Sequence, residues 1–337
     1  MEDARSKRIS KVDQAGGAPL DLATLAGVLK VCDLDVVLLE RHAARPTVET
    51  FIDQDALVYS VGTTFRFRGR FTLPPDWCLF GYVHQTEPHA SWCHGVDMET
   101  GVALTVLPGA SSEFVLGAGS RLTLVLTPQS ALRQHLSELG LGPSLPAVGQ
   151  YVRLFKPSGE ATARRLEQLA TRLARRVREP GPPPGQGDRQ EGASAYVRAH
   201  LMAKFAAAPT DRPRCSRGRL MHYRILRRAE DFMRLHLHRN VYMQEICDAV
   251  GVSERTLRYT FDDLLGISPN RYLSMLRLSI ANRSLSAGDA SRHSVKSIAL
   301  NCGLWDLSKF AGKYRQLFGE LPSDTLLRSP PVGLWRM

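Results

Sequence analysis

Arg255, Arg258 and Tyr259 stand at the spacing of one helix face in the segment "SERTLRYTF" at residues 253–261. A guanidinium on an exposed helix face can pair with the O6 and N7 atoms of guanine in the major groove of DNA. The alternative is that these three side chains only face solvent and do not contact DNA. Which of the two applies depends on the elements that position this segment.

The residues around this segment predict two helices joined by a tight turn. Gly251 permits the backbone conformation of the turn, and Ser253 is a predicted N-cap, because its hydroxyl can accept a hydrogen bond from the first turn of the second helix. Leu257 and Phe261 follow one turn apart and face inward. The first helix places its apolar face at Met243, Ile246, Cys247 and Val250. This is the pattern of a helix-turn-helix unit, whose second helix is free to lie in the major groove.

The same pattern recurs 52 to 53 residues later, in "VKSIALNCGLWDLSKFAGKY". Gly303 takes the place of Gly251, and Asp306 is the predicted cap in place of Ser253, after one extra residue in the turn. The inward positions of the two helices are Val295, Ile298, Ala299, Cys302, Phe310 and Tyr314. Chance does not readily explain two units that share the same pattern.

A helix is predicted between the two units, over residues 268–288, and begins at Ser268-Pro269. About sixteen helical residues would span roughly 24 Å. A helix of this length could hold the second helices of the two units about one duplex turn, or about 34 Å, apart. One chain could then contact two adjacent major-groove segments on one face of DNA.

Positive charge is concentrated in the same part of the chain. Residues 212–328 hold 20 Lys and Arg against 11 Asp and Glu, whereas the rest of the 337 residues hold 24 against 22. This concentration is the electrostatic footprint expected for binding a polyanion. No run approaches eighteen apolar residues, and "MEDARSKRIS" lacks the apolar core of a signal peptide. We therefore expect no membrane span and a cytoplasmic protein.

Short β-rich runs separated by Gly, Pro and Asp fill residues 35–126, which is typical of a β-sandwich or barrel. In "TFRFRGRFTL" the aromatic residues share one face with Gly69, and Arg66, Arg68 and Arg70 share the other. We therefore expect an α+β fold. Its predicted parts are a β-rich domain over 1–135, a helical connector and flexible linker over 136–220, and an all-α domain with two helix-turn-helix units over 221–330.

The connector contains three predicted segments. Residues 158–179 predict a helix with an apolar stripe, which we interpret as core packing, with the seam of a homodimer as the alternative. The stripe consists of Leu166, Leu169, Leu173 and Val177. A flexible loop is predicted at 180–192 and another helix at 193–209.

From "RRAEDFMRLHLHRN" at residue 227 to "FGELPSD" at residue 324, the chain resembles the AraC-type transcriptional regulators. The resemblance covers about a hundred residues and includes both units and the closing F-G-x-x-P-S segment. "VSERTLRYTFDDLLGISPN" and "GLWDLSKFAGKYRQLFGELPS" are most similar to the ethanolamine-operon regulator group. The resemblance implies binding of double-stranded promoter DNA, contact with RNA polymerase and activation of transcription.

The resemblance also implies roles for individual residues. Base-edge contacts of the first unit fall on Arg255, Arg258 and Tyr259. Those of the second unit fall on Leu307, Ser308, Lys309 and Lys313. Thr256 and Arg271 are the implied phosphate contacts, which position the protein without specifying sequence.

Three positions depart from the family pattern. Leu304 replaces an aromatic residue of the core, and Tyr314 replaces a phenylalanine. Gly312 occupies a position where arginine often approaches DNA, and glycine costs a helix up to about 1 kcal/mol relative to alanine. We therefore expect the second unit to recognise less sequence, or to use a close approach of its backbone.

AraC-type proteins often carry an N-terminal sensory domain, so the resemblance implies a cupin-like fold and a small-molecule effector of unknown identity. An aromatic set could line its pocket, with simple core packing as the alternative: Trp77, Phe80, Tyr82 and Trp92. His84, His89 and His94 lack the H-x-H pair and following Glu of a cupin metal site, and the six cysteines form no C-x-x-C pair. We expect reduced buried thiols, no metal, no cofactor and no catalytic residue.

Two hypotheses from other classes compete with a regulator. A cupin-like enzyme could use the basic C-terminal half only as a nucleic-acid tether, and a bound metal would favour it. An N-terminal protein-interaction module would leave a DNA footprint that needs no ligand. Neither explains the 53-residue repeat better than a DNA-binding regulator does.

Overall fold

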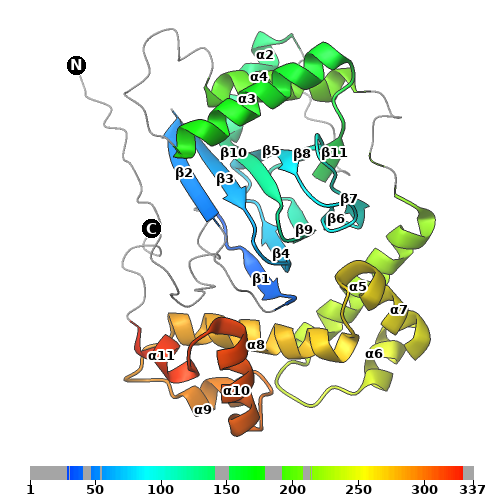
Figure 1. The fold of residues 1–337 in the computed structure, drawn as a ribbon, viewed down its shortest axis with the longest axis vertical. Coiled ribbons are helices and arrows are strands. Elements are labelled where there is room, and N and C mark those ends of the chain that lie inside the picture. The colour runs from blue at the N-terminus through cyan, green and yellow to red at the C-terminus, as the bar shows by residue number, and fades with distance from the viewer. Residues whose placement is uncertain are drawn as a thin grey trace.

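The computed structural model describes residues 29, 31–40, 47–53, 55–140, 152–178, 192–207, 213 and 215–328. A β-rich part comes first and a helical part last, so the predicted α+β class is confirmed. Helices α3 and α4 lie across one side of the β-rich part, and the C-terminal helices lie against the opposite side (Figure 1).

Two antiparallel sheets form the β-rich part. Sheet A has the strand order β1-β4-β9-β6-β7, and sheet B has the order β11-β8-β5-β10-β3-β2. The strands of sheet A are β1 (Asp35–Leu38), β4 (Phe67–Thr72), β6 (Trp92–Cys93), β7 (Val96–Asp97) and β9 (Ser111–Leu116). Those of sheet B are β2 (Thr47–Asp53), β3 (Ala56–Gly62), β5 (Trp77–Gln85), β8 (Ala103–Val106), β10 (Arg121–Pro128) and β11 (Val152–Phe155). The apolar core between them includes Phe67 from sheet A and Leu79 from sheet B.

Strand β4 shows the predicted alternation, and both of its faces are covered. Phe67 and Phe71 are buried in the core between the sheets. On the other face Arg68 is fully buried and Arg70 is about one-fifth exposed. The arginine face of this strand therefore lies against other protein groups and not against open solvent.

Three helices cover the outer face of sheet B: α2 (Gln129–Glu138), α3 (Glu160–Arg178) and α4 (Ala193–Ala206). Leu166, Leu169 and Leu173 are buried in a core that α3 shares with α4 and sheet B, and Val177 packs against it. The stripe is core packing, as interpreted. The alternative of a dimer seam along these leucines is wrong, because the same chain already covers them. Residues 180–191 of the predicted flexible loop lie outside the described residues.

The helical part contains α5 (Arg217–Leu235), α6 (Met243–Val250), α7 (Glu254–Leu265), α8 (Pro269–Ala287), α9 (Val295–Asn301), α10 (Leu307–Phe318) and α11 (Pro322–Leu327). In Figure 1, α8 runs between a group formed by α5, α6 and α7 and a second group formed by α9, α10 and α11. Its 19 residues span about 28 Å, somewhat more than the length expected from the sequence.

All six cysteines are free; Cys78, Cys93, Cys247 and Cys302 are buried, as predicted, whereas Cys32 and Cys215 are only partly buried. Burial raises the pKa of the Cys78 thiol to about 12, despite the opposing effect of Lys204. Such a thiol stays protonated and unreactive at neutral pH.

Candidate nucleic-acid interface

The first helix pair consists of α6 and α7 and is built as the sequence predicts. Gly251 follows α6 with a φ of 78°. Helix α7 begins after Ser253, whose hydroxyl accepts a hydrogen bond from the amide of Thr256 at 3.2 Å. Leu257 and Phe261 are fully buried. The predicted cap and inward face are both confirmed.

The opposite face of α7 is open to solvent. Arg255, Arg258 and Tyr259 are exposed there, and Thr256 is half-buried. The Nε atom of Arg258 donates to Oε1 of Glu254 at 2.9 Å, one turn earlier. An exposed pair of this kind contributes about 0.3–0.5 kcal/mol, so Arg258 can exchange Glu254 for another acceptor at little cost.

The second helix pair consists of α9 and α10 and repeats this construction. Oδ1 of Asp306 accepts a hydrogen bond from the amide of Lys309 at 3.0 Å, which confirms the predicted cap. Phe310 and Tyr314 are buried. Gly303 has a φ of 69°, and a Cβ atom there would collide with the carbonyl oxygen of Leu237. Only glycine fits this turn.

The outer face of α10 lacks a side chain at one position, Gly312. The predicted contact residues lie on its exposed side, except for the half-buried first one: Leu307, Ser308, Lys309 and Lys313. Nζ of Lys309 lies 3.0 Å from Oδ2 of Asp306. Gly312 is exposed, and a Cβ atom there would meet nothing within 4 Å. The space beside Gly312 is therefore open, and no neighbouring group packs against this position.

Helix α8 connects the two pairs. Its N-cap is Ser268, whose hydroxyl accepts a hydrogen bond from the amide of Arg271 at 3.4 Å. Arg271 is exposed in the first turn, five residues after Gly266 closes α7. Arg271 therefore lies next to the end of the first helix pair.

Tyr314 uses the hydroxyl that distinguishes it from the usual phenylalanine. The Oη atom accepts a hydrogen bond from Nδ2 of Asn282 on α8 at 2.7 Å and lies 2.7 Å from Oγ1 of Thr325 on α11. Thr325 in turn donates to Glu320. This buried chain of polar groups ties α10 to α8 and α11, and the sequence alone gave no sign of it.

A buried charge network joins the β-rich part to the helical part. It consists of Arg68 on β4, Glu113 on β9, Glu230 on α5 and Tyr272 on α8. Arg68 donates from Nη2 to Glu113 at 2.6 Å and from Nε to Glu230 at 2.8 Å. The Tyr272 hydroxyl donates to Oε1 of Glu230 at 2.7 Å. None of the three charged side chains is more than 1% exposed.

The neighbouring cations keep Glu230 ionised despite its burial. Burial alone would raise its pKa, but Arg68, Arg234 and Arg70, together with the Tyr272 hydroxyl, bring the pKa down to about 2. Removing one member of such a network leaves an uncompensated buried charge. The alternating arginines of "TFRFRGRFTL" were the one sign of this network in the sequence.

The four aromatic residues predicted to line a ligand pocket do not converge. Phe80 and Tyr82 pack beneath α3 and α4 on the outer face of sheet B. Trp92 is fully buried between sheet A and the helical part, with its ring 5.9 Å from that of Tyr223. Trp77 lies elsewhere, at the start of β5, and is only partly buried.

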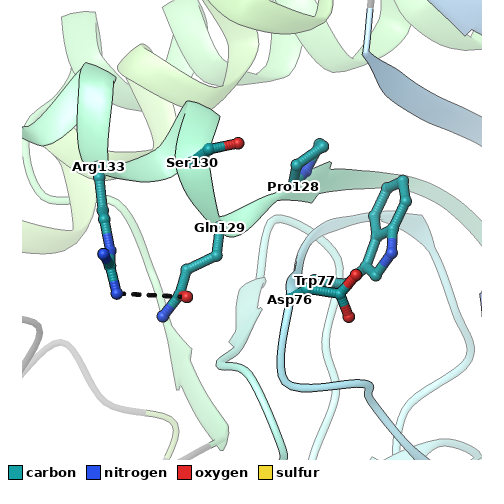
Figure 2. Close-up of a pocket in the computed structure, with 6 residues that line it drawn as sticks. All are labelled: Asp76, Trp77, Pro128, Gln129, Ser130 and Arg133. Atoms are coloured by element: carbon teal, nitrogen blue, oxygen red, sulfur yellow. Dashed lines mark hydrogen bonds between the residues drawn. The ribbon is translucent and has the colours of Figure 1, made fainter.

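A surface depression lies where β10 passes into α2, and Trp77 is its only member of that aromatic set. Figure 2 shows Asp76 and Trp77 on one side of it and Gln129, Ser130 and Arg133 on the other. Nη2 of Arg133 donates to Gln129 at 3.4 Å across one turn of α2. The depression therefore offers only one aromatic side chain to an apolar ligand.

The three histidines considered as metal ligands have separate partners. His84 pairs with Thr123, His89 with Asp97, and His94 with the Tyr223 hydroxyl at 2.9 Å. Within the described ranges, no three His, Cys, Asp or Glu side chains lie together so that they could hold a metal ion. Nor does any helix of those ranges have the length and apolar character needed to cross a membrane.

Comparison with known proteins locates the strongest similarity in the helical part. The family described as "Helix-turn-helix domain" matches residues 246–328, from α6 to the end of α11. The "Probable thc operon regulatory protein" of Rhodococcus erythropolis is 34% identical over 106 residues, which cover 32% of this chain and 32% of that protein. The "XylDLEGF operon transcriptional activator 1" of Pseudomonas putida is 35% identical over 101 residues, 30% of each chain. The chain thus spans about a third of the length of these relatives.

Among solved structures, a probable AraC family transcriptional regulator from Rhodopseudomonas palustris is 34% identical. The match covers 32% of this chain and 98% of that one, with a TM-score of 0.29. The family match covers both capped helix pairs. Residues 246–328 of this chain are a helix-turn-helix domain, and the chain is similar to regulators of the AraC family.

Proposed function

We propose that this protein is a sequence-specific DNA-binding regulator of transcription, and specifically an activator, that contacts two adjacent major-groove segments with two helix-turn-helix units. The first unit is α6 with α7, and the second is α9 with α10. The protein binds double-stranded promoter DNA and acts through RNA polymerase.

One observation carries this proposal: two similarly capped helix pairs sit at the two ends of α8, each with a polar outer face. Ser253 and Asp306 start the second helix of each pair, and Arg258 and Lys313 are exposed on them. A 19-residue helix of about 28 Å approaches the rise of one duplex turn, which is about 34 Å. The spacing supports simultaneous contact with two successive turns of one DNA face.

The names of the relatives support the assignment to transcription and to activation. Two of them are called an operon regulatory protein and an operon transcriptional activator. The finer likeness to ethanolamine-operon regulators rests only on the motifs in the sequence. We propose this likeness as a relationship by descent and do not infer a ligand from it.

We propose that the β-rich part controls DNA binding. In this proposal residues 1–135 form a cupin-like sensory domain, and residues 136–220 join it to the DNA-binding domain over 221–330. The buried charge network supports this, since its ion pairs connect the β-rich part directly to the helical part. A small-molecule effector would act by binding one arrangement of the parts more tightly than the other.

The test is a footprint of the purified full-length protein on the DNA upstream of its own gene, in moderate salt. Two protected major-groove segments about one turn apart would support the proposal. Protection of one segment would remove the second unit from the assignment. Loss of protection in the presence of excess random duplex would contradict sequence specificity. The Arg258→Ala variant should weaken protection at one segment only.

A further inference from the structure

The C-terminal end of α7 is held by side chains from the β-rich part. Two carbonyl groups there, of Leu264 and Leu265, have no partner within the helix. Arg66 donates from Nη2 to Leu264 at 3.0 Å and from Nη1 to Leu265 at 3.1 Å. The indole Nε1 of Trp92 donates to Leu264 at 2.9 Å. Three donors from a distant part of the sequence thus complete the end of this helix.

Charge strengthens this contact. The last turn of a helix carries partial negative charge, so a cation there is stabilising. Burial lowers the pKa of the Arg66 guanidinium, with Glu40 opposing that effect, but an arginine remains charged in a protein. Hydrogen bonds from a charged donor are about twice as strong as neutral ones. Arg66 therefore binds the end of α7 both as a charge and as a fork of two donors.

The donors are themselves fixed in position. The backbone amide of Arg66 donates to Glu40 at 2.7 Å, directly before β4. Trp92 is fully buried on β6, with the guanidinium of Arg68 5.2 Å from its ring centre. On the other side, Gly266 has a φ of 67°, and a Cβ atom there would lie 2.8 Å from Nη1 of Arg66. The left-handed backbone favours glycine at this position, and the absence of a Cβ atom leaves room for the guanidinium.

Helix α10 lacks this arrangement. It also ends at a left-handed glycine, Gly319, with a φ of 78°, but a Cβ atom there would meet nothing within 4 Å. Gly266, by contrast, lies directly against the Arg66 guanidinium. The two otherwise similar helices therefore differ in what holds their C-terminal ends.

We infer that Arg66 and Trp92 are positioning residues for the first DNA-contacting helix. The β-rich part fixes α7 in the orientation that binds DNA, and thereby sets the affinity of the first helix pair while leaving the second pair unaffected. This inference rests on the proposed function. It identifies the route by which a change in the β-rich part would reach the DNA.

The orientation held by Arg66 and Trp92 leaves the DNA-contacting face accessible. Arg255, Arg258 and Tyr259 are all exposed while both contacts to α7 are in place. The contacts lie at the opposite end of the helix from the Ser253 cap. The β-rich part therefore supports α7 without covering the side chains that would meet DNA.

The experiment compares full-length wild-type protein with Arg66→Ala and Arg66→Lys. Hydrogen exchange is measured on peptides from α7 and α10 without DNA, and affinity is measured on duplexes that carry both footprinted segments or only one of them. Arg66→Ala should speed exchange in α7 alone and weaken binding to the first segment about tenfold, as expected for losing charge-assisted hydrogen bonds. Arg66→Lys should fall between, because lysine keeps the charge but lacks the fork of two donors.

Arg121→Ala is the matched control, since Arg121 is exposed on β10 and bonded to Gln85 within the β-rich part. It should change neither measurement. Unchanged α7 exchange in Arg66→Ala, equal weakening at both segments, or tighter binding to the first segment would each overturn the inference. If the wild-type protein binds no DNA specifically, the proposed function fails, whereas the exchange data still decide whether Arg66 holds α7.

Discussion

The first and second helix pairs share one construction but are supported by different parts of the molecule. Both have a left-handed glycine in the turn, a side-chain cap on the second helix and two buried residues one turn apart. Helix α7, however, is bonded at its end to Arg66 and Trp92 of the β-rich part. Helix α10 is bonded through Tyr314 to its own neighbours α8 and α11.

This difference shows that a local pattern can repeat while its connection to the rest of the protein does not. The repeat reflects what any helix pair of this kind needs: a cap, a turn and a buried face. The supporting contacts depend on which surface the tertiary fold brings near each pair. The two units are therefore expected to respond differently to changes in the β-rich part.

The largest effect is expected from Glu230→Ala, because it leaves Arg68 fully buried with only Glu113 as a partner. Breaking a buried ion pair from one side costs about 3–5 kcal/mol of the free energy of unfolding. Urea denaturation should report this loss, with faster hydrogen exchange in α5, α7 and α8 than in α10. The control is Glu160→Ala, which removes an exposed pair with Arg164 and should cost under about 0.5 kcal/mol. Similar losses in both variants would contradict a stabilising role of the network.

The same residue predicts a specific acid sensitivity. The folded-state pKa of Glu230 is about 2, below its ordinary value of 4.5, since its cationic neighbours outweigh the effect of burial. A depressed carboxyl pKa stabilises the folded state fully above pH 4.5, and that contribution disappears as the pH falls towards 2. The full difference is on the order of 3 kcal/mol.

Comparing wild type with Glu230→Gln isolates this contribution, because all other carboxyl groups are common to both proteins. The wild-type advantage in the urea midpoint should be constant above pH 5 and should shrink between about pH 4.5 and pH 2. A difference that does not vary with pH would show that Glu230 is not ionised in the folded protein.

Arg258→Ala addresses the comparison at the level of DNA contacts. Loss of a base-edge contact should weaken specific binding by about 1–3 kcal/mol and relax the preference at one base position. Lys313→Ala on α10 should have the smaller effect if the second unit recognises less sequence. Binding measured on the specific duplex and on duplexes changed at single positions separates the cases. Equal losses for Arg258→Ala on specific and random duplexes would show a phosphate contact only.

The sequence predicted the elements whose signals are local. Ser253, Asp306 and Ser268 were predicted as caps or helix starts, and all three accept the expected amide hydrogen bond. The core residues of both helix pairs were predicted from helical periodicity, and the alternation in β4 was predicted from strand periodicity. Each of these depends on residues within one or two turns or within one strand.

Contacts between distant segments were not predictable in this way. The partners of Arg68 lie 45 and 162 residues further along the chain, in Glu113 and Glu230. Trp77, Phe80, Tyr82 and Trp92 do not form one site. Phe80 and Tyr82 share one face of β5, Trp77 packs against the core on the other face, and Trp92 belongs to the other sheet. Short strands such as β6 and β7 carry too few residues for any period to appear. Tertiary packing determines these features.

Tyr314→Phe tests the internal support of the second helix pair. The variant removes the hydroxyl that bonds Asn282 and Thr325 and leaves the buried Asn282 amide without that acceptor. The expected loss is about 1–2 kcal/mol of the free energy of unfolding, with exchange rising in α10 and α11 and not in α7. Phe310→Leu provides a control that changes packing without removing a polar group. Loss centred on α7 would contradict the separate support of the two pairs.

The smallest expected effect is at Gly312, where the second pair departs most from the first in its DNA-facing residues. Gly312→Ala should stabilise the protein by up to about 1 kcal/mol, because alanine favours the helix and its Cβ atom meets nothing within 4 Å. Gly319→Ala is the matched control: the space around it is equally open, but its φ of 78° strains any side chain, so the change should destabilise. Gly312→Arg should then raise affinity for the second DNA segment and increase the salt dependence of binding, as one added phosphate or base contact would. If Gly312→Arg leaves binding unchanged while Gly312→Ala stabilises, α10 does not approach DNA at this position, and the weaker role of the second pair lies in its placement and not in its missing side chain.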